Sequence, residues 1–389
     1  MKNMDELLSN EIRSLRARAQ VVAEEVAAPM AEQVDREGIW PEHTLRALRE
    51  ANLMGLQVPS RLGGHGQGLL ALAVLTETLA CACPSSAMCY GMHCVGTAVI
   101  AAKATPEQEQ KYLRPIAAGQ HLTTLALSES QTGAHFYLPQ TKLTRADGML
   151  VVNGAKQFVT NGSHADSYVV STTASAGVET GEFSCLVADS DSPGMAWQEE
   201  WHGVGMRGNS SRPLQLDDVR LPTENLLGSE GDQVWYVFEV VAPYFLTAMA
   251  GTYLGVAQAA LDIATAHLRS RRYGHSGESL AEVPVLQHRL AELWIAVQKT
   301  RGLLYNASRM GDLGDPQALP FVLACKADAG DTAVHVANEA MTLCGGTAYR
   351  ENSTLARLLR DARASHVMAP TTDLLKQWTG RALLGLPLL

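Results

Sequence analysis

The hydrophobic periodicity of this chain changes twice along its length, and these changes limit the folds that it can adopt. Up to about residue 111, apolar residues recur every three or four positions, as in amphipathic helices. Between about residues 121 and 227 the period is two, which is typical of strands. The helical period then returns and continues almost to the C-terminus. The pattern predicts an α+β chain with a helical region over residues 1–120, a β region over 121–231 and a helical region over 232–389.

Length and composition restrict the class of protein further. A chain of 389 residues fits two or three packed units, and 46% apolar with 18% charged residues indicates a well-buried, oligomeric globular protein. The net charge of −9 argues against a nucleic-acid partner, which would need clustered Lys and Arg. The first residues are charged and no apolar run is long enough to cross a bilayer, so we expect neither a signal peptide nor a membrane span.

The seven cysteines form no disulfide framework by their spacing, which predicts reduced thiols in a cytoplasmic protein. Four of them lie close in the sequence to a histidine, and such a group could suggest a metal site. However, the segment is rich in Ala and Met and contains no C-x-x-C pair, so we predict buried thiols and no metal. The residues concerned are Cys81, Cys83, Cys89, Cys94 and His93.

Two segments in the β region carry the most chemical information. Residues 125–134 and 156–162 each begin as an apolar, strand-type run and end in hydroxyl, amide and glycine residues. Each strand would therefore deliver polar groups to one edge of a sheet. Such an edge suits a flat, partly polar ring system, which needs donors for its heteroatoms and an aromatic side chain against its face.

These two segments resemble T-E-P-x-A-G-S-D and K-x-W-I-T-N-G, the flavin-binding strands of the acyl-CoA dehydrogenase superfamily. Residues 204–222 are similar to its G-x-R-G-S and F-x-D-V-x-V-P phrases, and residues 360–363 to R-D-A-K. The matches cover essentially the whole chain. The resemblance implies an all-α N-terminal domain, a β-barrel-like central domain, a C-terminal four-helix bundle, bound FAD, and a homo-oligomer that is a tetramer.

The resemblance also assigns cofactor-binding positions. Ser128 would hydrogen-bond the flavin pyrimidine edge, Phe158 would pack beside the isoalloxazine, and the hydroxyl of Thr160 would contact flavin N5. The C-terminal glycine-rich loop would approach the FAD of a neighbouring subunit. The Arg on the flavin pyrophosphate would be Arg271, with Arg269 and Arg272 as alternatives. The other expected cofactor-binding residues are Leu125, Leu127, Gly133, Gln287, Thr342, Gly345 and Gly346.

The chain departs from the family where most members carry the catalytic Glu that removes the substrate α-proton. Ala369 occupies that position, and the alternative position on the first C-terminal helix falls at Tyr244 or Phe245. Losing a positioned base costs about a hundred- to ten-thousandfold in rate. Two candidate bases remain. Asp373 lies one helical turn beyond Ala369 but could instead cap the last helix, and His93 could instead be a hydrogen-bonded core histidine.

The resemblance leaves three functions open. The first is an FAD-dependent oxidoreductase of the acyl-CoA dehydrogenase type that forms an α,β-enoyl thioester and passes electrons to an acceptor flavoprotein. The second is a flavin-dependent monooxygenase supplied by a flavin reductase. The third is a catalytically silent subunit. The substrate would be an acyl thioester or another small apolar molecule. Ala134 and His135 replace the Ser-Asp of the family motif, which weakens the case for CoA as the carrier.

Overall fold

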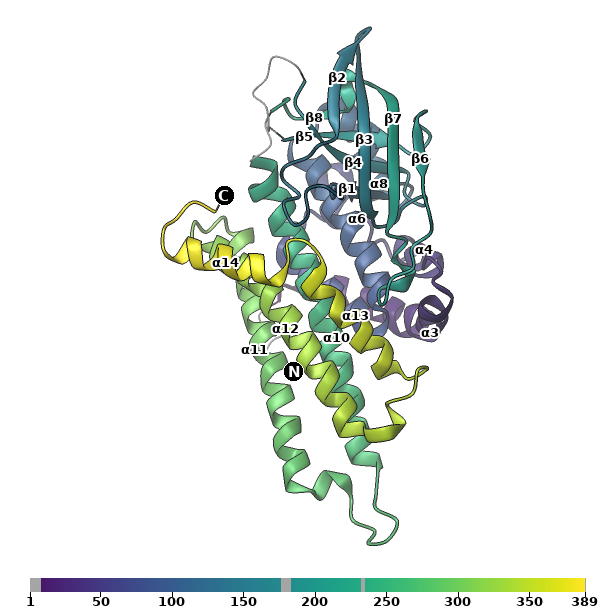
Figure 1. Cartoon of the computed structure of the whole chain (residues 1–389), viewed down its shortest axis with the longest axis vertical. Coiled ribbons are helices and arrows are strands. Elements are labelled where there is room, and N and C mark those ends of the chain that lie inside the picture. Colours follow the sequence, from purple (N-terminus) through teal and green to yellow (C-terminus); the bar gives the residue numbers. More distant parts are fainter. Residues whose placement is uncertain (1–7, 176–182, 232–234, 389) are drawn as a thin grey trace.

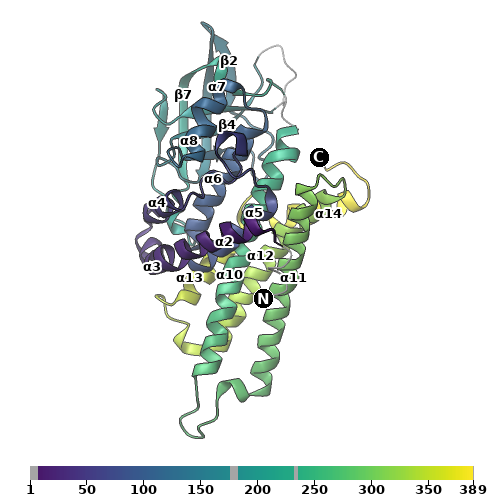
Figure 2. The ribbon, with the colours of Figure 1, turned by 180° about the vertical axis from the view of Figure 1, so that it is seen from behind.

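The structure is a computed structural model that describes residues 8–175, 183–231 and 235–388. Figures 1 and 2 show a helical N-terminal part and a long helical bundle meeting a β part at one end of the molecule. The architecture confirms the predicted α+β class, with helical regions on both sides of a central β region. One hydrophobic core runs through all three parts, so they pack as a continuous body.

The N-terminal part packs around two apolar helices, α5 (Leu69–Ala82) and α6 (Pro84–Ala102), which are buried on nearly every side. The side chain of Asp312 accepts hydrogen bonds from the backbone N–H groups of Leu69 and Leu70, and so caps α5 from the C-terminal bundle. The remaining helical elements of this part are α2 (Asn10–Val22), η1 (Ala23–Ala27), α3 (Ala28–Glu37), α4 (Glu42–Glu50), η2 (Ser60–Leu62), α7 (Pro106–Gln108), η3 (Glu109–Leu113) and α8 (Arg114–Ala117).

The thiol prediction is confirmed for Cys83, Cys89 and Cys94, which are buried. It is wrong for Cys81, which is exposed near the end of α5. The helix points this position outward although the flanking sequence is apolar. The sequence therefore located the apolar segment correctly, while the packing around α5 decided which of its residues reach the surface.

The β part consists of two four-stranded sheets, with strand orders β1-β4-β5-β8 and β2-β3-β7-β6. All pairs are antiparallel except β1 with β4, which is parallel. Asp147 and Gly148 both have positive φ, 53° and 74°, in the tight turn between β2 and β3. The strands are β1 (Thr123–Ala126), β2 (Lys142–Ala146), β3 (Met149–Val159), β4 (Ser167–Thr173), β5 (Phe183–Asp189), β6 (Met195–Trp197), β7 (Arg212–Pro222) and β8 (Leu226–Leu227), with the short helices η4 (Arg207–Asn209) and η5 (Thr223–Asn225).

The C-terminal bundle is built around one long apolar helix. The helical stretch Tyr236–Ser270 is apolar and long enough to cross a membrane, but 83% of its most apolar window is buried, as in the core helix of a bundle. The chain runs up and down the bundle, so the ends of α10 and α12 lie far from the β part (Figure 1). The elements are η6 (Tyr236–Val241), α10 (Ala242–Ser270), η7 (Leu280–Glu282), α11 (Pro284–Asp312), α12 (Ala318–Cys344), η8 (Gly345–Thr347), α13 (Thr354–Val367) and α14 (Thr372–Leu383).

Candidate active site

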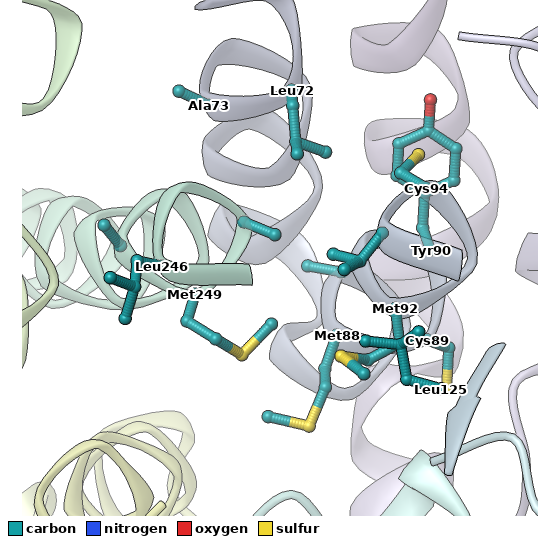
Figure 3. Packing of buried hydrophobic residues seen from close by; sticks show 14 of the residues in the cluster. Leu72, Ala73, Met88, Cys89, Tyr90, Met92, Cys94, Leu125, Leu246 and Met249 are labelled. Atoms are coloured by element: carbon teal, nitrogen blue, oxygen red, sulfur yellow. The ribbon is translucent and has the colours of Figure 1, made fainter. Parts of the chain in front are cut away.

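A cavity of about 900 Å³ lies where the ends of β1 and β3 meet α6, α10 and α13. Most of its surface is apolar. Figure 3 shows the side chains of Met88 and Met249 extending from α6 and α10 toward the same space, close to Leu125 of β1. The residues predicted to bind a flavin that line this cavity are Leu125, Leu127, Ser128, Gly133, Phe158 and Thr160.

A buried ion pair joins the two strand motifs. The Nζ atom of Lys156 on β3 donates to Oε1 of Glu129 at 2.6 Å and to the backbone oxygen of Ser171 at 2.6 Å. The same carboxylate accepts hydrogen bonds from the backbone N–H groups of Gln140 and Thr141. Glu129 thus fixes the loop that follows β1, which supports the structural role suggested by its place in the motif.

Two backbone contacts complete the junction between the motifs. The N–H of Gln157 donates to the carbonyl oxygen of Ser128 at 2.8 Å, and the hydroxyl of Thr124 donates to the carbonyl oxygen of Thr160 at 2.9 Å. β1 is an edge strand among the described strands of its sheet. One row of its backbone donors and acceptors therefore has no strand partner and faces away from β4.

Phe158 occupies an unusual position at the cavity wall. Its φ of 55° is rare for an aromatic residue, and it lies in an irregular stretch of the β3–β7 pairing. The side chain is 63% exposed and makes an edge-to-face contact with Trp201, with ring centroids 6.1 Å apart. The strand therefore presents an aromatic ring to the cavity, where a planar ligand could pack against it.

Behind Thr160, a chain of polar contacts leads to the apolar wall. The hydroxyl oxygens of Thr160 and Ser211 are 3.1 Å apart. Asn209 accepts a hydrogen bond from the Ser211 N–H at 3.1 Å and donates to the sulfur of Met88 at 2.9 Å. Asn209 and Ser211 were not predicted as site residues, although they lie in the segment that matched the G-x-R-G-S phrase, which was the signal available for finding them.

The wall opposite the strand edge is rich in methionine and other large apolar side chains. Methionine is flexible and polarizable, so such a surface can adapt to acyl groups of different shapes. Ala369 and Phe245, two of the positions predicted to replace a catalytic Glu, line the cavity, whereas the alternative Tyr244 does not. The apolar lining residues are Met88, Met92, Met206, Val241, Phe245, Met249, Val367 and Met368.

Three charged side chains line the cavity: Glu129, Arg360 and Arg363. Burial opposes the charge on Glu129, but the Lys156 ammonium and the hydrogen bonds outweigh it, so the pKa of Glu129 is lowered. Arg360 is paired with Asp35, at 2.8 Å between Nη1 and Oδ1. Arg363 makes no hydrogen bond or ion pair within the described ranges of the chain, so its guanidinium is available to a ligand.

The structure does not support His93 as the catalytic base. Its ring is fully buried and does not line the cavity. The backbone N–H of Thr123 donates to Nδ1 at 3.2 Å, so Nε2 carries the proton and donates to the carbonyl oxygen of Met54 at 3.0 Å. Burial lowers the pKa of His93 to about 4. His93 is therefore a hydrogen-bonded core histidine, which the sequence analysis gave as the alternative to a catalytic base.

Asp373 does not reach the cavity either. It is exposed in the first turn of α14 and is absent from the cavity lining, whereas Thr371 lines the cavity and caps the helix by accepting a hydrogen bond from the Leu374 N–H. An acidic residue in a first turn interacts favourably with the helix dipole. Neither predicted base is thus placed for proton abstraction.

The remaining predicted cofactor residues lie at the far end of the bundle. A helix rises about 1.5 Å per residue, so Arg271 at the end of α10 is about 39 Å from Phe245 at the cavity. This separation is longer than one FAD molecule. The ends of α10 and α12 and the start of α11 meet there, away from the β part (Figure 1). The residues at this end are Arg271, Gln287, Thr342, Gly345 and Gly346.

The cavity thus combines the end of an edge strand, two buried hydroxyls, an exposed aromatic ring and an apolar chamber. These features fit the polar edge and flat face of an isoalloxazine beside an apolar substrate, which is the site of a flavin-dependent oxidoreductase. The ring would lie against Phe158, with the hydroxyls of Ser128 and Thr160 near its heteroatoms.

Comparison with known proteins identifies the family. Models of the acyl-CoA dehydrogenase N-terminal, middle and C-terminal domains match residues 9–120, 124–219 and 246–384. The chain therefore belongs to the acyl-CoA dehydrogenase family, which confirms the resemblance seen in its motifs. It is an oxidoreductase, and FAD is its cofactor.

Individual relatives agree over nearly the whole chain. The chain is 31% identical over 366 residues to a cyclohex-1-ene-1-carbonyl-CoA dehydrogenase of Geobacter metallireducens, covering 93% of this chain and 95% of the relative. It is 29% identical to the mitochondrial isovaleryl-CoA dehydrogenase of Arabidopsis thaliana, covering 93% and 88%. Among solved structures, the butyryl-CoA dehydrogenase of Megasphaera elsdenii has a TM-score of 0.91 at 26% identity, covering 97% and 99%.

Proposed function

We propose that this protein oxidises an acyl-CoA with an apolar, branched or cyclic acyl group to the α,β-unsaturated thioester. The observation that carries the proposal is the methionine-rich chamber beside the strand edge that fits the flavin. Two of the relatives are named for a branched and a cyclic acyl-CoA, isovaleryl-CoA and cyclohex-1-ene-1-carbonyl-CoA, which supports this substrate class.

Each residue that lines the cavity would have its own role in the proposed reaction. Bound FAD supplies the hydride acceptor. Phe158 and Thr160 would hold the flavin ring at the strand edge, and Met88 and Met249 would contact the acyl group from the apolar wall. Arg363 offers a guanidinium to an anionic group of the thioester carrier. The Glu129 carboxylate is engaged by Lys156, so the α-proton would pass to a water molecule in the cavity, and the reaction would be slow without a positioned base.

Anaerobic titration tests this proposal. Isovaleryl-CoA and cyclohexanecarbonyl-CoA are added to the holoprotein while the visible flavin absorbance is followed. We expect at least one of them to bleach the flavin. Substituting Arg363→Ala should raise the KM for the reactive thioester by about tenfold, as expected for a lost charge-assisted hydrogen bond, with little change in kcat. Flavin that stays oxidised with both thioesters would overturn the proposal.

The lack of a free carboxylate favours a second candidate, a flavin-dependent monooxygenase. Among the described lining residues, Glu129 is the only carboxylate, and it is held in an ion pair. A monooxygenase needs no base for an α-proton. In that case thioesters would leave the flavin oxidised, while supplying reduced flavin from a reductase would start oxygen consumption in the presence of an apolar substrate.

We also propose that the protein works as a homo-oligomer. The cluster at the far end of the bundle contains an arginine and two adjacent glycines, but it is too distant to contact FAD bound in the cavity of the same chain. A partner subunit could place Arg271 and the Gly345–Thr347 turn against the pyrophosphate and adenosine. An electron-transferring flavoprotein is the proposed electron acceptor.

A further inference from the structure

Lys326 is a buried cation that the proposed chemistry does not use. It lies on α12, its side chain is fully buried, and its Nζ atom donates to three backbone carbonyl oxygens. The acceptors are Ser365 at 2.8 Å, Met368 at 3.0 Å and Pro370 at 2.8 Å. No described carboxylate forms an ion pair with it. A buried charge without an opposite charge costs free energy, so its presence calls for a specific role.

The three acceptors lie at the end of α13 and in the turn that leads to α14. Met368 and Pro370 line the cavity, and Ala369 between them lines it too. Lys326 therefore holds the backbone on both sides of the position where the family carries its Glu. Only an ammonium group has three N–H donors on one atom, so all three bonds require the protonated side chain.

A second contact brings the same two elements close together. Gly330 lies one helical turn after Lys326, and a Cβ atom there would be 3.0 Å from the Cβ of Ser365. The absence of a side chain thus lets α12 approach α13 closely. From α10, the hydroxyl of Tyr253 contacts the sulfur of Met368 at 3.7 Å. The turn is therefore anchored from two helices.

We propose that Lys326 is a positioning residue whose three hydrogen bonds fix the turn of residues 365–371 as one wall of the substrate cavity. This inference rests on the proposed function only for its effect on acyl-CoA binding, since the anchoring of the turn can be measured without substrate. When one bond is lost, the turn should open more often and hold the acyl group less tightly.

The protonation state of Lys326 gives the anchor a pH dependence. Burial lowers the pKa of Lys326 to about 7, and no charged neighbour adds to that shift. An opened turn would expose the side chain to water, where its pKa is higher, so opening above pH 7 takes up a proton and becomes less favourable as the pH rises. Charged or titratable groups on the surrounding helices include Tyr253, Asp328, Asp331, Arg360, Asp361, Arg363, His366, Asp373 and Lys376.

His366 needs a control because it lies on α13 and contacts Asp331 at 3.0 Å. Asp331 also binds Lys376 at 2.7 Å, and Asp328 accepts a hydrogen bond from Thr300. The variant His366→Gln removes the titrating group of the first pair. The variant Lys376→Met removes an exposed lysine of the same region and serves as the matched control for Lys326→Met.

Hydrogen–deuterium exchange of the FAD-loaded protein tests the anchor. Rates for peptides covering residues 365–372 are corrected for intrinsic exchange and measured from pH 6 to pH 9. In the parent protein we expect the corrected exchange in this segment to slow as the pH rises above 7, by at most about tenfold per pH unit, because opening takes up one proton. In Lys326→Met exchange should be fast at every pH, while Lys376→Met and His366→Gln should behave like the parent.

Lys326→Arg keeps the hypothesis testable if Lys326→Met does not fold. Arginine stays charged throughout this range, so the pH response should vanish in that variant. Binding of isovaleryl-CoA, followed by the flavin spectrum, should weaken about tenfold in the Lys326 variants, with FAD retained. Exchange in Lys326→Met that equals exchange in the parent would contradict the anchoring role of Lys326. A pH response that persists in Lys326→Met and disappears in His366→Gln would also contradict it. If no thioester changes the flavin spectrum of the parent, but exchange still differs between the parent and Lys326→Met, only the proposed function is overturned.

Discussion

Lys156 and Glu129 are 27 residues apart in the chain, yet their side chains meet at 2.6 Å inside the β part. Each belongs to one of the two motifs that the sequence singled out. The pair is almost fully buried, and the remaining oxygens and protons are used by Ser171, Thr141 and Gln140. This contact explains why a Glu at the end of one strand and a Lys near the end of another accompany a flavin site.

The first prediction concerns this pair. Lys156→Met should lower the free energy of unfolding by about 3–5 kcal/mol, because it leaves the Glu129 carboxylate buried without its counter-charge. Adding Glu129→Gln to this variant should restore part of the lost free energy of unfolding. Urea denaturation of the two variants measures both effects. If the double variant is no more stable than Lys156→Met, the unpaired charge is not the source of the loss.

Restoring a carboxylate at Ala369 should increase dehydrogenase activity. Ala369→Glu places a potential base on the turn that Lys326 anchors, at the position where the family carries it. A positioned base contributes about a hundredfold or more, so we expect flavin reduction by isovaleryl-CoA to accelerate by at least about that factor. Ala369→Gln has the same size and no base, and serves as the control. Equal rates in the two variants would show that a missing base does not limit the reaction.

The two bases suggested by the sequence should prove dispensable for chemistry. In Asp373→Asn the thioester should reduce the flavin at the parental rate, because the Asp373 side chain is exposed outside the cavity. His93→Gln should lower the free energy of unfolding by about 1–3 kcal/mol, because it disturbs the buried bonds to Thr123 and Met54. Anaerobic stopped-flow and thermal unfolding distinguish these effects. If flavin reduction in correctly folded Asp373→Asn were a hundredfold slower than in the parent, Asp373 would be the base after all.

Arg271→Ala should weaken FAD binding by about tenfold or more without altering the cavity, if a partner's Arg271 binds the pyrophosphate. The dissociation constant is measured by flavin fluorescence, and oligomeric state by sedimentation of the same samples. Arg289→Ala, which removes a cation from the first part of α11, is the control. A flavin-loaded parental monomer of about 42 kDa at micromolar concentration would contradict the shared site.

A pH prediction follows from Asp361, whose carboxylate is buried and accepts a hydrogen bond from the Met206 N–H at 2.6 Å. Burial raises its pKa from 3.8 to about 6. Between these values the folded state binds more protons than the unfolded state, so the stability contributed by the protonated form below about pH 4 is lost as the pH rises through 6.

Asp361→Asn keeps the acceptor and removes the charge. Relative to the parent, this variant should gain up to about 3 kcal/mol in the free energy of unfolding between pH 4 and pH 7, since each pKa unit corresponds to about 1.4 kcal/mol. Parallel urea titrations at several pH values give the difference directly. A difference that stays constant across this range would mean that Asp361 does not titrate there.

The sequence by itself determined the order of the three regions, the Asp147-Gly148 turn and the strand ends that carry Ser128, Phe158 and Thr160. These features depend on local periodicity and on turn residues, which act within a few positions of one another. Alternation within a strand also fixes which of its residues share a face. The meeting of the ends of β1 and β3 at one cavity was decided by the tertiary structure, because the two strands lie in different sheets.

Only the tertiary structure decided the roles of His93, Asp373 and Lys326. On a helix, periodicity indicates an apolar face, but the direction of one polar side chain depends on how the helix is rotated and packed against its neighbours. His93 faces the backbone of Met54 and Thr123, Asp373 faces solvent, and Lys326 faces three carbonyls of another helix end. These contacts join residues 30 to 44 positions apart, and such distant partners leave no local pattern in the sequence.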